Sequence, residues 1–212
     1  MARETTMLDT ADAITLEAEI DVPLDRWAGV VLAHPHPTFG GNMHATVTDA
    51  LFEALPRHGI ATVRFNFRGV GASEGTWDEG PGELADYRAA LDSMSSLYPD
   101  AELWAAGFSF GSWVALTVGA KHDRVRVLLG IGPPVDRYDF SVVRNSPKPK
   151  FLIQAERDEL CPLKRAYEFY AQLAEPKELV VIDGADHLFD GRVPEVADAI
   201  VDLLQDYRTP TN

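Results

Sequence analysis

The sequence contains a single cysteine, Cys161, in 212 residues. An internal disulfide is therefore impossible, and a reducing compartment is the expected environment. Basic residues are also scarce: 19 Lys and Arg stand against 33 Asp and Glu, which gives a formal net charge of −14. Because nucleic acids and anionic membrane surfaces repel a chain of this charge, we expect neither as a partner.

Long apolar runs are missing as well. The first residues, 1–6, lead into no apolar signal segment, and no run approaches the roughly 18 residues that a membrane span needs. These features predict a soluble, cytoplasmic protein. The length and a hydrophobic content of 46% predict one globular domain, residues 1–212, with a core that needs no disulfide or metal.

The apolar residues predict strands that alternate with helices along nearly the whole chain. Residues 14–21 alternate with period two, which is typical of an antiparallel edge strand with one wet face. Buried strands are expected at 27–33, 60–67, 102–106, 125–132, 150–155 and 178–182, and helices near 47–55, 84–94, 112–120, 163–173 and from 194 onward. This order predicts an α/β fold: a mostly parallel, twisted central sheet with helices on both faces and ligands at the carboxyl ends of the strands.

Gly107-Phe108-Ser109-Phe110-Gly111 falls between a predicted strand and a predicted helix. Glycine two residues before and two after the serine permits a tight strand-to-helix turn, in which neighbouring backbones come too close for a side chain. The hydroxyl then stands clear of the sheet, beside free N–H groups at the helix N-terminus. The pattern predicts Ser109 as a nucleophile, with a structural turn serine as the alternative.

A serine hydroxyl is a poor nucleophile until a base takes its proton, and the base works best when a carboxylate orients it. His187 is the best candidate for the base, because it lies in the loop 183–189 between the last predicted strand and the last helix. A loop histidine without a role is the alternative.

The carboxylate is expected after the preceding strand, in the segment 155–162, because the chain order of such a set is Ser, acid, His. Asp158 is favoured there, since it lies far enough beyond the strand to turn back over the sheet, whereas Glu156 and Glu159 are expected in solvent. Asp186 is adjacent to the histidine in sequence and is badly placed to reach its ring. Cys161 lies in no comparable turn and is expected to be a small core residue.

The loop His34-Pro35-His36-Pro37 raises a second chemical possibility. Two histidines separated by one residue after a strand form a known metal-ligand layout, so a metal-dependent hydrolase using His34 and His36 is an alternative. A catalytic zinc also needs a third protein ligand and an Asp or Glu nearby, which the sequence does not space convincingly. We therefore predict no metal and no cofactor.

Together these motifs resemble the α/β-hydrolase superfamily. The resemblance rests on the 107–111 motif, the Asp158 segment and the loop 184–187, and it implies Ser109 as nucleophile, Asp158 as acid and His187 as base. More narrowly, the segments 34–41 and 64–73 are similar to a group of small bacterial α/β hydrolases without a lid domain.

The superfamily usually inserts its lid where this chain has only residues 133–149, which show no clear helical period. We therefore expect no large cap domain and an exposed cleft that suits small or flexible acyl esters. Several large side chains in loops on this side of the sheet are expected either to line a pocket or to cover the core. They are Trp77, Tyr138, Phe140, Leu188 and Phe189.

The oxyanion of a tetrahedral intermediate needs two positioned donors. One is expected from the backbone N–H of Phe110, the residue after the nucleophile, and the other from the loop after His34. Superfamily members commonly have His-Gly in that loop, with the following residue as donor, and Pro35 replaces the glycine here. Because Pro35 and Pro37 have no N–H, His36 is the expected second donor.

The expected function is therefore that of a serine hydrolase, carboxylesterase-like, that acts through a Ser-His-Asp triad and an acyl-enzyme. Its partner would be a small-molecule acyl substrate, with thioesters and activated amides open beside esters. The main alternative from another class is a non-catalytic binding or interaction protein on the same fold.

Overall fold

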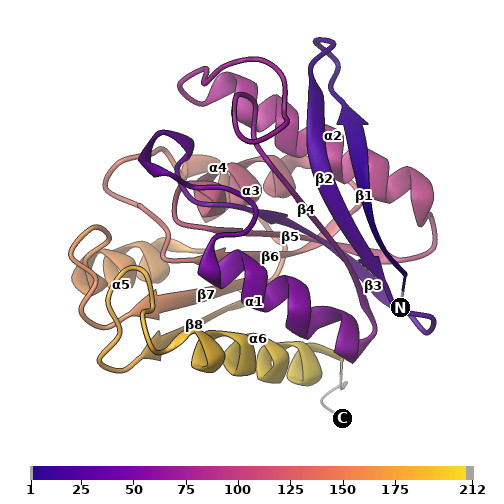
Figure 1. The fold of residues 1–212 in the computed structure, drawn as a ribbon. Helices are drawn as coiled ribbons and strands as arrows, with labels where there is room; N and C mark the ends of the chain where they lie inside the picture. Colours follow the sequence, from indigo (N-terminus) through magenta and orange to yellow (C-terminus); the bar gives the residue numbers. More distant parts are fainter. Residues whose placement is uncertain (1, 209–212) are drawn as a thin grey trace.

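In the computed structural model, which describes residues 2–208, one sheet contains eight strands in the order β1-β2-β4-β3-β5-β6-β7-β8 (Figure 1). The strands are β1 (Ala2–Asp9), β2 (Thr15–Val22), β3 (Ala28–Ala33), β4 (Ile60–Phe65), β5 (Glu102–Phe108), β6 (Val125–Ile131), β7 (Lys150–Ala155) and β8 (Lys177–Ile182). β2 runs antiparallel to both of its neighbours, and the other adjacent pairs are parallel. The predicted α/β fold is confirmed.

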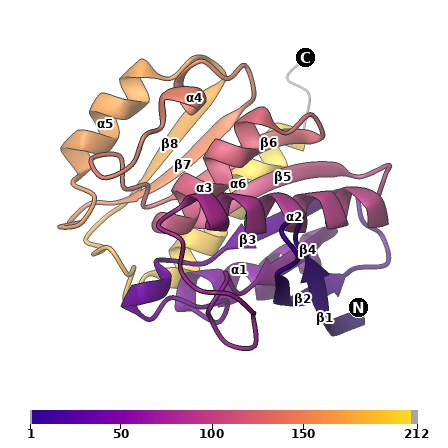
Figure 2. The same cartoon turned by 90° about the horizontal axis from the view of Figure 1, so that it is seen from above.

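Helices cover both faces of this sheet (Figure 2). They are α1 (Thr46–Ala54), α2 (Pro81–Leu97), α3 (Phe110–Lys121), α4 (Ser141–Arg144), α5 (Leu163–Gln172) and α6 (Val193–Arg208), with short 3₁₀ turns η1 (Pro37–Phe39) and η2 (Leu55–His58). α1 and α6 pack on one face, and α2, α3, α4 and α5 contribute to the core on the other. None of the helices in this part of the chain is both long and apolar enough to cross a bilayer.

The central strands are buried because both of their faces meet helices. All six positions of β3 are buried, and so is every position of β5 except its first. Burial of one large apolar side chain contributes roughly 1.5–3 kcal/mol, so continuous apolar strands are most stable in the middle of a covered sheet. In contrast to these strands, helix α6 is buried along one face only. Val196, Ile200 and Leu203 lie on that face, as the helical spacing predicts.

One sequence-based prediction about the strands is wrong, and two elements were not predicted. The strand predicted at 14–21 is β2, antiparallel as expected, but it is not an edge strand because β1 pairs with it from Ala2 to Asp9. β1 was not predicted, since its side chains are mostly exposed and carry little apolar signal. The segment 133–149, which shows no clear helical period, contains the single turn α4, which is too short to have one.

The parallel strands end at one rim of the sheet. The loop with His34 and His36 follows β3, Ser109 follows β5, Asp158 follows β7 and His187 follows β8. Because these strands share one direction, their carboxyl ends bring together loops that are far apart in the sequence.

Candidate active site

Ser109 lies at the apex of the turn between β5 and α3. Its backbone has φ 54° and ψ −121°, a conformation that residues other than glycine rarely adopt. A side chain on Gly107 would collide with the backbone of Gly111, and one on Gly111 would collide with the carbonyl oxygens of Ala33 and His34. Glycine is therefore sterically required at both positions, as the sequence pattern predicts.

The structure brings Ser109, His187 and Asp158 together in one hydrogen-bonded series. Ser109 Oγ lies 2.9 Å from His187 Nε2, and His187 Nδ1 lies 2.8 Å from Asp158 Oδ2. The Asp158 side chain is completely buried and the His187 side chain is 9% exposed. An ionised carboxylate can only accept hydrogen bonds, so Nδ1 carries the ring proton and donates a hydrogen bond to Asp158. Nε2 is then free to accept a hydrogen bond from the serine O–H.

The Asp158 carboxylate is held by three further donors. Its Oδ1 accepts from the backbone N–H groups of Leu160, at 2.9 Å, and Cys161, at 2.7 Å, while Gln154 Nε2 donates to Oδ2 at 3.1 Å. These bonds fix the orientation of the carboxylate toward His187. The sequence analysis missed Gln154, although a glutamine near the end of a strand that is expected to be buried needs hydrogen-bond partners there.

The other acidic residues near the histidine make different contacts. Glu156 accepts a hydrogen bond from the Gly184 backbone N–H at 2.7 Å, and Glu159 is exposed. Asp186 Oδ1 accepts from the backbone N–H groups of Leu188, at 3.0 Å, and Asp190, at 3.2 Å. Asp186 therefore stabilises the turn that carries the histidine and makes no hydrogen bond to the imidazole.

Cys161 is buried beside this series. Burial, with a further contribution from the Asp158 charge, raises the pKa of its thiol to about 12, so the thiol stays protonated at neutral pH. Potential ligand atoms of Cys161, Asp158 and His187 lie within 4.8 Å of one another. Asp158 and His187 already bond to each other, so their closeness is explained without a metal.

The imidazole of His34 is buried and shapes the loop after β3. Its Nε2 accepts from the Phe67 backbone N–H at 3.1 Å, and its Nδ1–H donates to the Pro35 carbonyl at 2.6 Å. Burial lowers the pKa of His34 to about 3, so the ring is neutral at physiological pH. Nδ1 of His36 accepts from the Thr38 backbone N–H at 3.3 Å. Both His34 nitrogens are thus engaged within the protein, which argues against the alternative of a metal held by His34 and His36.

Two backbone N–H groups beside Ser109 make no hydrogen bond to any described residue: those of His36 and Phe110. Phe110 is the first residue of α3, where helical N–H groups have no partner within the helix. The two residues also touch through their rings, whose centroids are 5.0 Å apart. Burial, followed by the nearby positive charge of Arg137, lowers the pKa of the His36 imidazole.

Two cavities adjoin Ser109. The smaller, about 230 Å³, is lined by His36, Phe39, Ser109, Phe110, Pro134, Arg137, Tyr138, Leu160 and Cys161. The larger, about 310 Å³, is lined by Pro35, His36, Phe39, Gly40, Gly41, Ala45, Thr46, Val47, Phe108, Ser109, Leu160, His187 and Leu188. Phe39, Leu160 and Leu188 are exposed at 80%, 49% and 62%. They give the site an apolar rim.

Of the five large loop side chains that were expected to line a pocket or cover the core, three lie at or beside the cavities and two lie in the core. Tyr138 lines the smaller cavity and Leu188 the larger one. Trp77 packs against the rings of His36 and Phe110, which form part of the cavity wall. Phe140 and Phe189 are fully buried in the two hydrophobic cores, as core-covering residues would be.

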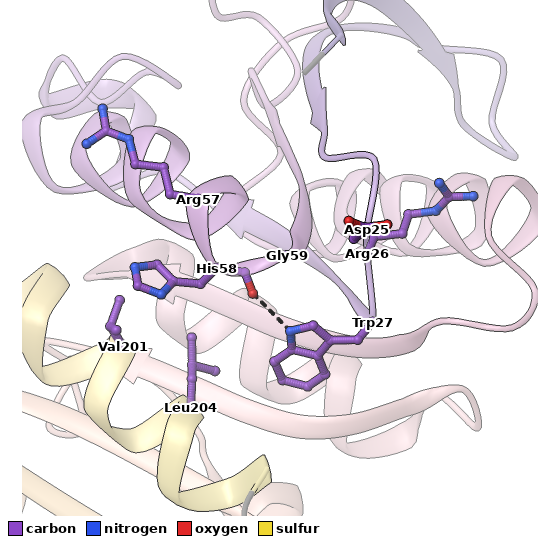
Figure 3. Close-up of a pocket in the computed structure, with 8 residues that line it drawn as sticks. All are labelled: Asp25, Arg26, Trp27, Arg57, His58, Gly59, Val201 and Leu204. Carbon is purple, nitrogen blue, oxygen red and sulfur yellow. Dashed lines mark hydrogen bonds between the residues drawn. The ribbon is translucent and has the colours of Figure 1, made fainter.

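A cavity of about 660 Å³ lies at the opposite end of the sheet, before β3 and β4 (Figure 3). It is lined by Asp25, Arg26, Trp27, Arg57, His58, Gly59, Val201 and Leu204. Figure 3 shows the guanidinium groups of Arg26 and Arg57 pointing away from each other, while Trp27 Nε1 donates to the His58 carbonyl at 2.9 Å. No residue predicted for the site lies there.

This chain is similar to known proteins in both sequence and structure. Residues 28–146 match the family described as serine aminopeptidase, S33, and this match includes Ser109. An uncharacterized protein of Rickettsia prowazekii is 35% identical over 183 residues, which cover 82% of this chain and 77% of that protein.

Two solved structures are similar to this chain over almost its full length. An α/β serine hydrolase homologue from Coxiella burnetii is 35% identical, with a TM-score of 0.90 over 96% of this chain and 98% of that chain. A protein of Xanthomonas campestris, described as an α/β serine hydrolase without a lid, is 32% identical, with a TM-score of 0.89 over 100% of this chain and 98% of that one. These similarities confirm the predicted superfamily and the fold without a large cap.

Proposed function

Because this chain belongs to the family described as serine aminopeptidase, S33, within the α/β-hydrolase superfamily, we propose that it is a serine hydrolase that cleaves carboxylic esters of small molecules. In this proposal Ser109 is the nucleophile, His187 the base and Asp158 the residue that orients it. The observation that carries the proposal is the unbroken hydrogen-bonded series from Ser109 Oγ through the imidazole to the buried carboxylate.

Acylation would begin when the Ser109 oxygen attacks the ester carbonyl carbon as its proton moves to His187 Nε2. The carbonyl oxygen becomes an oxyanion, which the backbone N–H groups of His36 and Phe110 would stabilise. Their lack of acceptors among the described residues supports this role. The imidazolium that forms is stabilised by the Asp158 carboxylate, which stays ionised.

The intermediate then collapses, the carbon–oxygen bond to the alcohol breaks, and His187 Nε2 gives its proton to the departing oxygen. Water attacks the Ser109 acyl ester in the second half of the reaction, with the same histidine first accepting its proton and then returning one to the serine oxygen. The acid and the released alcohol are the products. Every proton in this cycle passes through one nitrogen.

The family description names aminopeptidases, but the charges near Ser109 favour a different substrate. A peptide N-terminus carries a positive charge at neutral pH, and a carboxylate is its strongest hydrogen-bonding partner. None of the residues that line the two cavities at Ser109 is acidic, and one of them, Arg137, is a cation. Esters without a charged amine therefore fit the site better than peptides.

A fluorophosphonate probe and p-nitrophenyl esters of increasing chain length test the proposal. We expect one covalent adduct on Ser109, turnover of short esters, and loss of both in Ser109→Ala. Absence of an adduct on the folded protein would favour the non-catalytic binding protein. Turnover that persists in Ser109→Ala and disappears with a chelator would favour the metal-dependent alternative.

A further inference from the structure

The position of His187 distinguishes the two cavities at Ser109, if the proposed function holds. His187 must protonate the departing alcohol, so the alcohol part of the substrate has to lie on the imidazole side of the serine. His187 lines the 310 Å³ cavity and is not among the residues around the 230 Å³ cavity. The acyl part therefore belongs in the smaller cavity, beside Phe110.

The acyl cavity is small and has a rigid wall. Its volume of about 230 Å³ lies below the roughly 300–1,000 Å³ that is typical of pockets for drug-sized ligands. Tyr138 stacks on Trp113, with ring centroids 4.6 Å apart and planes 22° apart, and Trp113 Nε1 is fixed by a 3.0 Å hydrogen bond to the Asp139 carbonyl. The wall cannot move back easily, so the cavity suits short acyl chains.

Arg137 is the one permanently charged residue that lines this cavity. Its guanidinium group has no ion pair and no hydrogen bond with any described residue, whereas the neighbouring Asp136 pairs with Arg165 at 3.4 Å. Its backbone is anchored by a 3.0 Å hydrogen bond to the Pro134 carbonyl. The fork of N–H donors on an arginine matches a carboxylate in shape and charge. In a chain of net charge −14, this cation stands unpaired where the acyl group would end.

We infer that Arg137 is a specificity-determining residue that selects short acyl groups ending in a carboxylate, so that the preferred substrates are monoesters of dicarboxylic acids. The apolar wall formed by Phe110 and Tyr138 would pack against the methylene chain, and the guanidinium group would pair with the distal carboxylate at the exposed end of the cavity. The ester carbonyl remains at Ser109.

Two esters with equal acyl carbon number test this inference: mono-p-nitrophenyl adipate, with a free carboxylate, and p-nitrophenyl hexanoate, without one. The measured quantity is the ratio of their kcat/KM values. We expect Arg137→Ala to lower this ratio about tenfold, mainly through KM for the adipate, because a partly exposed charge-assisted pair contributes about 1.4 kcal/mol. Arg137→Glu should lower the ratio further, and Arg137→Lys should retain part of it.

Arg126→Ala is the matched control. Arg126 is exposed on β6, away from the cavity, and its replacement changes the net charge by the same amount. We expect its ratio to equal that of the unmodified protein, and we expect added salt to lower the ratio of the unmodified protein but not that of Arg137→Ala.

An unchanged ratio in both Arg137→Ala and Arg137→Glu would overturn the role of Arg137 and leave ester cleavage intact. Failure of the unmodified protein to cleave either ester, together with no fluorophosphonate adduct, would instead overturn the proposed function. The two failures are therefore distinguishable.

Discussion

Cavities lie at both ends of the central sheet, and the two ends differ in the chemical groups that surround them. The cavity at the amino ends of β3 and β4 is the larger, about 660 Å³ against about 230 Å³ beside Ser109. Its arginines, Arg26 and Arg57, point away from each other (Figure 3). At the carboxyl ends, loops after four different strands bring a hydroxyl, an imidazole, a carboxylate and two N–H groups to one point. The two ends therefore differ in the reactive groups that lie close together, and the volume of the cavity does not predict where those groups are.

The largest loss of activity is expected when the carboxylate that accepts a hydrogen bond from His187 is replaced. Replacement of Asp158 by Asn removes the negative charge and favours the wrong imidazole tautomer, so we expect kcat for a p-nitrophenyl ester to fall about 10³–10⁴-fold. Asp186→Asn, one residue from the histidine in sequence, is the control and should retain most of the activity because Asp186 bonds only backbone N–H groups. Equal losses in both variants would contradict the assignment of Asp158.

The second prediction isolates one N–H of the proposed oxyanion hole. His36 has φ −55° and ψ 121°, which proline can adopt, so His36→Pro should remove the N–H while keeping the course of the loop. We expect kcat to fall about 10²–10³-fold relative to His36→Ala, which loses the same ring but keeps the donor. Similar rates in the two variants would place the second donor elsewhere.

The third prediction concerns stability and the buried ring of His34. Its pKa is about 3 in the folded protein and 6.5 in its unperturbed state, so between these values the unfolded chain binds a proton that the folded protein does not. Stability must therefore fall as the pH drops below 6.5, by about 1.4 kcal/mol between pH 7.5 and 5.5 from this group.

Urea unfolding at the two pH values measures this contribution. His34→Asn should lack it, and the exposed His58→Asn should keep the pH dependence of the unmodified protein. If His34→Asn shows the full pH dependence as well, another group is responsible.

The smallest effect on activity is expected from replacements at the 660 Å³ cavity, at the amino ends of β3 and β4. Because Arg57 and His58 lie at the end of the sheet far from Ser109, the double replacement Arg57→Ala and His58→Ala should leave kcat/KM for p-nitrophenyl esters within about twofold. A loss comparable to that of His36→Pro would remove the distinction between the two ends.

Local patterns predicted most of the fold because the central strands are apolar on both faces and the helices have a clear spacing. Local patterns did not predict β1 or α4, because neither element has a clear apolar pattern of its own. β1 is largely exposed and is formed by pairing with β2, and α4 is a single turn without a period of its own. Neither carries enough apolar side chains for its sequence to reveal it.

The candidate site shows the same division. Sequence reasoning selected Asp158 from a segment with several carboxylates, but the donors that hold it, Gln154 and two backbone N–H groups, come into view only in three dimensions. Arg137 was not singled out at all, because an arginine in a loop has no special meaning until the loop is seen beside a cavity.

The turn at Ser109 could be predicted from local sequence, because the steric need for Gly107 and Gly111 acts within five consecutive residues. The donors that hold Asp158, and the position of Arg137 in the lining of the 230 Å³ cavity, became visible only in the folded chain. The cavity lining joins loops separated by dozens of residues, and the distances between these loops are set by the packing of the sheet that carries them.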